Sequence, residues 1–202
     1  MFSSNRIRRR IASALVVLIA VFSISGCASF STSKNKSKAR PTEEKQLVIP
    51  DFPTAKEQYS FAIMYQRSLI ISPDMARRQV QMDKVTQCHD RVLKNFPGDQ
   101  TYAPLAMVAI ADANASIGEL PTAIEIYHAT MAKYPDNEYI QARALFAIAR
   151  TLDNQGKFQE AKDTYRQVME RFSASHSAAV QDLVRRAQGL YFTVKETIKS
   201  KR

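Results

Sequence analysis

Hydrophobic and small residues recur along this chain at a fixed interval. The segment Gly118–Pro135 (GELPTAIEIYHATMAKYP) is followed 38 positions later by Gly156–Ser173 (GKFQEAKDTYRQVMERFS). The paired positions that keep their character are Gly118 and Gly156, Leu120 and Phe158, Ala123 and Ala161, Tyr127 and Tyr165, Met131 and Met169, and Tyr134 and Phe172. A less regular copy lies one such interval earlier, at Met82, Val85, His89, Leu93, Phe96 and Pro97. A fixed period of this size is typical of a repeat array.

Each full copy of the repeat predicts two antiparallel helices. The first, helix A, is expected at 102–117 and 140–155, and the second, helix B, at 121–133 and 159–171. Each helix A ends at a glycine, which accepts the left-handed backbone conformation that commonly follows a helix. Small residues are expected where the two helices of a pair approach closely: Ala111, Ala123, Ala149 and Ala161. The bulky Tyr127 and Tyr165 are expected where the next pair stacks on. Because one pair cannot bury its apolar face alone, neighbouring pairs must stack on it.

Helical spacing extends on both sides of the two clear repeats. Helices are expected at 55–71 and 75–95, separated by the breaker Ser72-Pro73-Asp74, and at 176–198. The last helix is in register with helix A, since Leu183, Ala187 and Leu190 follow Leu145, Ala149 and Leu152 by one repeat interval. The sequence therefore predicts an all-α domain at 54–198, built from about three helix pairs and a C-terminal capping helix, followed by a basic tail at 199–202.

This part of the chain resembles the tetratricopeptide repeat (TPR) family. The residues at that family's spacings are Gly118, Leu120, Ala123, Tyr127 and Pro135. The resemblance covers about residues 75–190 and departs from the family in a slightly longer period, in Thr130 and Val168 at positions that are commonly small, and in Ser173 instead of a closing proline. It implies a right-handed superhelix of antiparallel pairs, with the A helices lining its concave face.

Residues 1–26 predict a lipoprotein signal peptide. Four arginines precede an apolar run at 11–25, which is short for a membrane span and ends in small residues. The segment Ile24-Ser25-Gly26-Cys27 resembles the bacterial lipobox, which implies cleavage between Gly26 and Cys27 and lipid attachment, including palmitate, at Cys27. The alternative is an ordinary secretory signal with a chance cysteine. Ala28 resembles the residue of lipoproteins sorted to the outer membrane in bacteria with two membranes, which implies a periplasm-facing, lipid-anchored protein.

The net charge of +10 is unevenly distributed. Residues 1–26 carry +4, residues 27–53 carry +2 and residues 195–202 carry +3, whereas 54–194 carry only +1. The composition of 27–53 predicts a flexible tether, which either lies against anionic head groups or is simply a soluble linker. Because basic and acidic residues alternate in the helical part, nucleic acid is excluded as the main partner.

Candidate chemistry is sparse. Cys88-His89-Asp90 is the only run of nucleophile, base and acid, but neighbours on a helix point about 100° apart, and the register of Cys88 and His89 places both in the core. No glycine-rich phosphate loop is present. We therefore expect no catalytic residue, no metal, no cofactor besides the lipid on Cys27, and no small-molecule substrate.

A binding surface remains as the expected functional feature. Transferring the family's inner-face positions predicts a partner-binding groove with exposed apolar residues beside two arginines: Leu105, Val108, Asp112, Arg143, Phe146 and Arg150. Such a groove suits an extended or helical peptide with apolar anchors and an acidic group. The alternative is that these residues pack against a neighbouring helix or the tether.

Two functions fit the sequence. The first is a protein-protein interaction scaffold at the membrane that holds an envelope protein, in its sharpest form an accessory of outer-membrane protein assembly. The KYPDNE and QGKFQEA turns, the long period and the lipobox resemble the BamD-like and CpoB-like repeat proteins of the bacterial envelope. The second is a regulator or docking subunit of a periplasmic cell-wall enzyme. A polysaccharide-export or secretion factor would present the same features.

Overall fold

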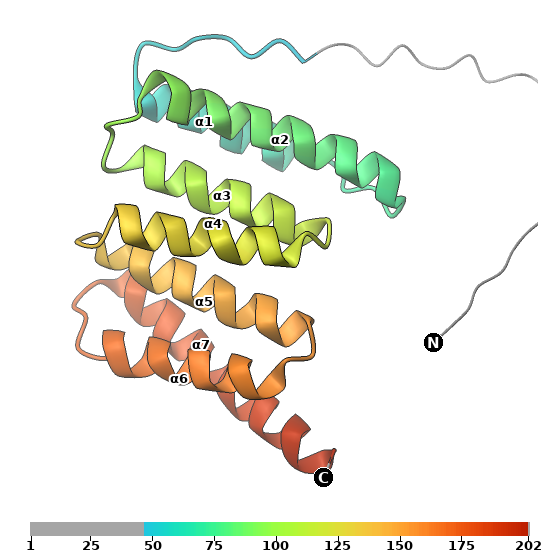
Figure 1. Ribbon diagram of the computed structural model, residues 1–202. Coiled ribbons are helices and arrows are strands. Elements are labelled where there is room, and N and C mark those ends of the chain that lie inside the picture. The colour runs from blue at the N-terminus through green and yellow to red at the C-terminus, as the bar shows by residue number, and fades with distance from the viewer. Residues whose placement is uncertain (1–46, 202) are drawn as a thin grey trace, which may run out of the picture. The chain divides into compact units, whose positions relative to one another are not determined.

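The computed structural model describes residues 47–201 (Figure 1). This part of the chain contains seven α-helices and no strand, as the sequence predicts. The helices are α1 (Ala55–Ser68), α2 (Met75–Asn95), α3 (Tyr102–Ser116), α4 (Leu120–Lys133), α5 (Glu138–Asn154), α6 (Phe158–Phe172) and α7 (Ala178–Ser200). The predicted signal peptide, Cys27 and most of the tether lie outside the described residues.

The helices form a stack of hairpins (Figure 1). Each helix packs on the next one along the chain, and α7 packs on both α5 and α6. Alternate helices also touch: α1 contacts α3, α3 contacts α5, and α5 contacts α7. The odd-numbered helices therefore form one continuous layer, as helix A does in a helical-repeat array.

Two glycines end the A helices as predicted. Gly118 follows α3 with φ of 90°, and Gly156 follows α5 with φ of 72°. The junctions between repeats use a different device, a glutamine side chain that binds backbone carbonyls of the preceding turn. Gln141 Nε2 donates to Met131 O at 2.7 Å and to Tyr134 O at 3.0 Å. Gln181 Nε2 repeats this at the next junction, where it donates to Ser175 O at 2.7 Å.

The predicted packing positions form the core. The four small residues Ala111, Ala123, Ala149 and Ala161 are completely buried, as is Tyr165, and Tyr127 is almost so. The main cluster extends through α3–α7. A second, smaller cluster consists of Met82, Val85 and Ala113, with partly buried residues of α1 and the α3 turn packed against it. The hairpin α1–α2 thus has its own small hydrophobic cluster beside the main core.

The first and last helices differ from their predicted bounds. α1 ends at Ser68, three residues early, because Leu69 is extended and the side chain of Gln81 in α2 binds the following loop. α7 begins at Ala178 and continues to Ser200, two residues into the predicted tail.

The end of the predicted flexible tether is held in place. Gln58, which is completely buried, accepts a hydrogen bond from Phe52 N at 3.0 Å and donates one to Pro50 O at 3.1 Å. Asp51 pairs with Arg91 of α2 at 2.9 Å. Because one amide side chain satisfies both a backbone donor and an acceptor, residues 50–52 are fixed against the first hairpin.

Candidate functional site

The predicted groove residues lie on α3 and α5, two adjacent helices of the odd-numbered layer, but not all of them are exposed. Val108 is fully buried and Phe146 is 4% exposed. The ring of Phe146 packs 6.0 Å from that of Tyr165, and the guanidinium of Arg186 lies 4.9 Å from its centroid. These two residues therefore pack in the core, which was the alternative interpretation. Leu105 is partly buried.

Asp112 is the centre of a polar network. Its Oδ2 lies 2.8 Å from Arg143 Nη2, and its Oδ1 accepts a hydrogen bond from the hydroxyl of Tyr127 at 2.6 Å. Burial, followed by the neighbouring Asp112 charge, raises the pKa of Tyr127, so this hydroxyl remains a donor. The Asp112 and Arg143 charges therefore largely neutralise each other within the groove.

The next repeat lacks this network. Arg150 follows Asp112 by one repeat interval, and Tyr165 follows Tyr127 by the same interval. Tyr165 is completely buried and its hydroxyl has no hydrogen-bond partner among the described residues. Arg150 is exposed and forms no ion pair with a residue that the structure describes. In the second repeat, the cation Arg150 therefore takes the place of the anion Asp112. Its charge remains available for a ligand.

Three hollows follow one another along this face, and Asp112 lines all of them. The first, about 500 Å³, lies between the α1–α2 hairpin and α3 and is lined by Gln66, Ile71, Arg78, Met82, Asp112, Ala113 and Ser116. The second, about 270 Å³, lies between α3 and α5 and includes Tyr127 and Arg150. The third, about 210 Å³, reaches α7 and includes Arg143, Phe146, Arg150 and Arg186. The surface changes from apolar to basic along its length.

Several lining residues were not foreseen from the sequence, among them Arg186 and Gln66. Arg186 on α7 has Ile148 as its counterpart in the preceding repeat, so the period gives no indication of an inner-face cation there. Gln66 lies on α1, which is outside the repeat register. It is placed by its contact with His89, whose Nε2 lies 3.4 Å from Gln66 Oε1.

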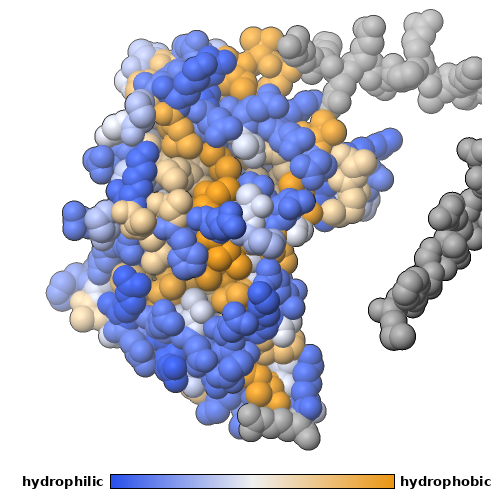
Figure 2. Space-filling view, in the orientation of Figure 1, coloured by the Kyte–Doolittle hydropathy of each residue, from blue (hydrophilic) through white to orange (hydrophobic). Residues whose placement is uncertain are grey.

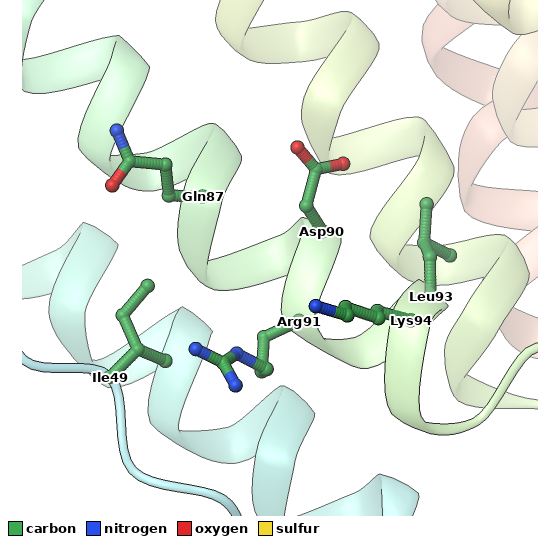
Figure 3. A pocket seen from close by; sticks show the side chains of 6 residues that line it. All are labelled: Ile49, Gln87, Asp90, Arg91, Leu93 and Lys94. Atoms are coloured by element: carbon green, nitrogen blue, oxygen red, sulfur yellow. The ribbon is translucent and has the colours of Figure 1, made fainter.

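A fourth hollow lies on the other side of the first hairpin (Figure 3). It has a volume of about 570 Å³ and is lined by Ile49 from the extended segment and by Gln87, Asp90, Arg91, Leu93 and Lys94 from α2. Figure 3 shows Ile49 and Arg91 facing each other across it. Arg91 is already paired with Asp51, whereas the exposed Asp90 and Lys94 form no ion pair with a described residue.

The cysteine and histidine of α2 are core residues. Cys88 is completely buried, and burial raises the pKa of its thiol to about 11, which keeps it protonated at neutral pH. Burial, with a smaller effect of Arg143, lowers the pKa of His89 to about 4. Within the described residues there is no group of three or more potential metal ligands. No helix among them is long and apolar enough to cross a membrane.

Comparison with known families finds a match to the tetratricopeptide repeat over residues 143–175. This segment begins in α5 and ends in the turn after α6, so it covers most of the second full repeat. Neither the curated proteins nor the solved structures contain a match to this chain. Tetratricopeptide repeats generally mediate protein–protein interactions, and extended concave surfaces are where such arrays bind. Residues 143–175 are therefore a tetratricopeptide repeat within an all-helical repeat fold of that type.

Proposed function

We propose that this protein is a lipid-anchored scaffold on the periplasmic face of the outer membrane, whose odd-numbered helices bind an extended peptide segment of an envelope protein. The observation that carries the peptide-binding part is the set of three neighbouring hollows that share Asp112, two of which are lined by Arg150, unpaired among the described residues. An apolar side chain fits the wide first hollow beside Met82, and a carboxylate fits the basic end between Arg150 and Arg186. A charged hydrogen bond to an arginine is worth more than a neutral one.

The membrane part rests on the sequence. The resemblance of Ile24–Cys27 to a lipobox supports acylation of Cys27, and Ala28 supports outer-membrane sorting. The resemblance to BamD-like repeat lipoproteins supports an accessory role in outer-membrane protein assembly as the sharpest form of the proposal.

The groove is tested by selecting binders from a random peptide library displayed on phage, using residues 28–202, which contain the whole described core. We expect the selected peptides to share an acidic residue spaced from an apolar one. Arg150→Glu should weaken their binding by tenfold or more, roughly the effect of losing one charge-assisted contact. Arg166→Glu on α6 is the matched control, because Arg166 is exposed outside the odd-numbered layer.

Two results would contradict the groove assignment: selected peptides without an acid, or equal loss of binding in both variants. The anchor is tested separately by metabolic labelling with an alkyne-bearing fatty acid. Wild type should incorporate the label and Cys27→Ser should not; labelling that survives in Cys27→Ser would exclude this cysteine as the attachment site.

A further inference from the structure

The free end of the α1–α2 hairpin exposes an unusual share of apolar surface. Seven large hydrophobic residues of the described chain are exposed, and five of them fall within residues 64–80: Met64, Ile70, Ile71, Met75 and Val80. Ile70, in the loop between the helices, is 91% exposed. Figure 2 shows apolar surface at this end of the hairpin, at the right of the view, beside hydrophilic surface.

The backbone of the loop that carries Ile70 is held by side chains of α2. Gln81 Nε2 donates to Ile70 O at 2.8 Å, and Gln81 Oε1 accepts from Ser72 N at 3.0 Å. Arg78 Nε donates to Ser72 O at 3.0 Å. These side chains from α2 fix the loop backbone, so the exposure of Ile70 is not the result of an unrestrained loop. A solvent-facing isoleucine gains nothing for folding in this position.

The charges around the tip are mainly positive. Arg67 and Arg77 are exposed, and neither forms an ion pair with a described residue. Arg78 is partly buried beneath the loop. Asp74, the acid between the loop and α2, caps the helix by accepting from Arg77 N at 2.9 Å. An apolar apex flanked by arginines matches the chemistry of an anionic lipid surface, in which apolar residues enter the interface and cations meet the head groups.

We propose that this hairpin tip, centred on Ile70 and Met75 and flanked by Arg67 and Arg77, contacts an anionic lipid surface and orients the repeat unit on the membrane. A protein partner would have to supply a pocket for the protruding Ile70, whereas a lipid surface needs none. The neighbouring recess is the first hollow, lined by Ile71, whereas Ile70 is a nearly fully exposed apex.

The proposed tether is long enough to permit this orientation. The chain from Cys27 to Leu47 reaches roughly 70 Å when extended. α2 has 21 residues and is about 32 Å long. The length of the tether therefore allows either end of the hairpin to meet the bilayer. In this proposal, the surface chemistry of the tip determines which end does. This step rests on the proposed membrane anchorage, while the contact itself can be tested without Cys27.

The test uses residues 28–202 with an N-terminal histidine tag bound to nickel-chelating lipid, which supplies the anchor independently of acylation. Ile70→Cys carries the polarity-sensitive fluorophore NBD; Cys88, the only native cysteine left, is completely buried and is checked for labelling in the unsubstituted chain. Phe192→Cys is the matched control, since Phe192 is also an exposed apolar residue but lies on α7.

On vesicles containing phosphatidylglycerol, we expect the emission of NBD at position 70 to shift to the blue and to be quenched by lipids brominated in their acyl chains. NBD at position 192 should show neither effect. Replacing phosphatidylglycerol by phosphatidylcholine, or introducing Arg67→Gln with Arg77→Gln, should reduce the signal at position 70. Identical spectra on vesicles and in solution, equal signals at the two positions, or a shift that requires an added protein would each overturn the proposal.

Discussion

Tyr127 and Tyr165 occupy the same position in successive repeats and both are buried, but only Tyr127 has a partner for its hydroxyl among the described residues. The partner is Asp112, and its counterpart in the next repeat is Arg150, a cation that cannot accept a hydrogen bond. Burial, and next the charge of Asp153, raise the pKa of Tyr165, so this phenol is neutral at any physiological pH. The second repeat therefore carries an unpaired hydroxyl next to an available arginine.

We expect the two tyrosine-to-phenylalanine substitutions to have different effects on stability. Tyr127→Phe removes a hydrogen bond to a carboxylate and should lower the free energy of unfolding by about 2 kcal/mol. Tyr165→Phe removes a polar group that has no partner and should leave stability unchanged or raise it by up to about 1 kcal/mol. Urea denaturation of both variants measures the difference. Equal losses would mean that the Tyr165 hydroxyl has a partner in solution.

At this scale the period predicts which positions point inward, but not what surrounds them. It correctly predicts buried tyrosines and small alanines, because packing between repeats imposes the same size at the same position. It does not predict that Arg186 covers Phe146, because that contact comes from the capping helix, whose residue there has an isoleucine as its repeat counterpart.

In the repeats, the helices end where the local sequence requires it. Substituting the helix-ending Gly156, with Gly189 inside α7 as the comparison, tests this. Gly156 has a φ of 72° after α5, so Gly156→Ala should cost about 1 kcal/mol of unfolding free energy. Gly189 lies within α7, with open space where a Cβ would be, so Gly189→Ala should add up to about 1 kcal/mol. Chemical denaturation monitored by circular dichroism checks both, and a stabilising Gly156→Ala would contradict the left-handed conformation.

The elements of the described chain were largely predictable from the sequence, since its seven helices arise from strong helical periodicity and clear breakers. α2 has the predicted bounds, 75–95, with Asp74 as its N-cap. The end of α1 was not predictable, because the extended loop after Ser68 is fixed by Gln81 from a different helix. Apolar residues at 69–71 continue the helical pattern of the sequence. The side-chain amide of Gln81, from α2, binds the backbone there in an extended conformation instead.

The buried hydrophobic residues are unevenly distributed over the seven helices of the described chain. The buried residues of the main cluster all lie in α3–α7 or the turn after α4, and of the described residues of the first hairpin only Leu93 of α2 packs against it. The smaller cluster of Met82, Val85 and Ala113 joins α2 to α3. In a repeat array, each unit is stabilised by its own interactions and by those with its neighbours. The first hairpin, which has a described neighbour on one side only, is therefore the segment most susceptible to local unfolding.

His89 makes this susceptibility dependent on pH. Its ring is completely buried, with Gln66 as a weak partner at 3.4 Å and Tyr59 5.6 Å away between ring centroids. Burial, and then the charge of Arg143, lower its pKa from 6.5 to about 4. The pKa of His89 is lower in the folded state than in the unfolded state. Between pH 6.5 and about 4, the unfolded hairpin therefore binds a proton at His89 that the folded hairpin does not. Stability is thus lost as the pH falls from about 6.5 toward about 4, by up to roughly 3 kcal/mol.

Hydrogen exchange at pH 7 and pH 5, corrected for the intrinsic pH dependence of exchange, should detect this loss. We expect protection to fall first in α1 and α2 at pH 5, while α5 and α6 remain protected, because the proton enters the hairpin and not the main cluster. His89→Gln cannot take up a proton in this range and should give the same corrected protection at both pH values. If the hairpin of His89→Gln opens in acid as readily as wild type, another group is responsible. If α1–α6 lose protection together, the array unfolds as one cooperative unit and the first hairpin is not separable from it.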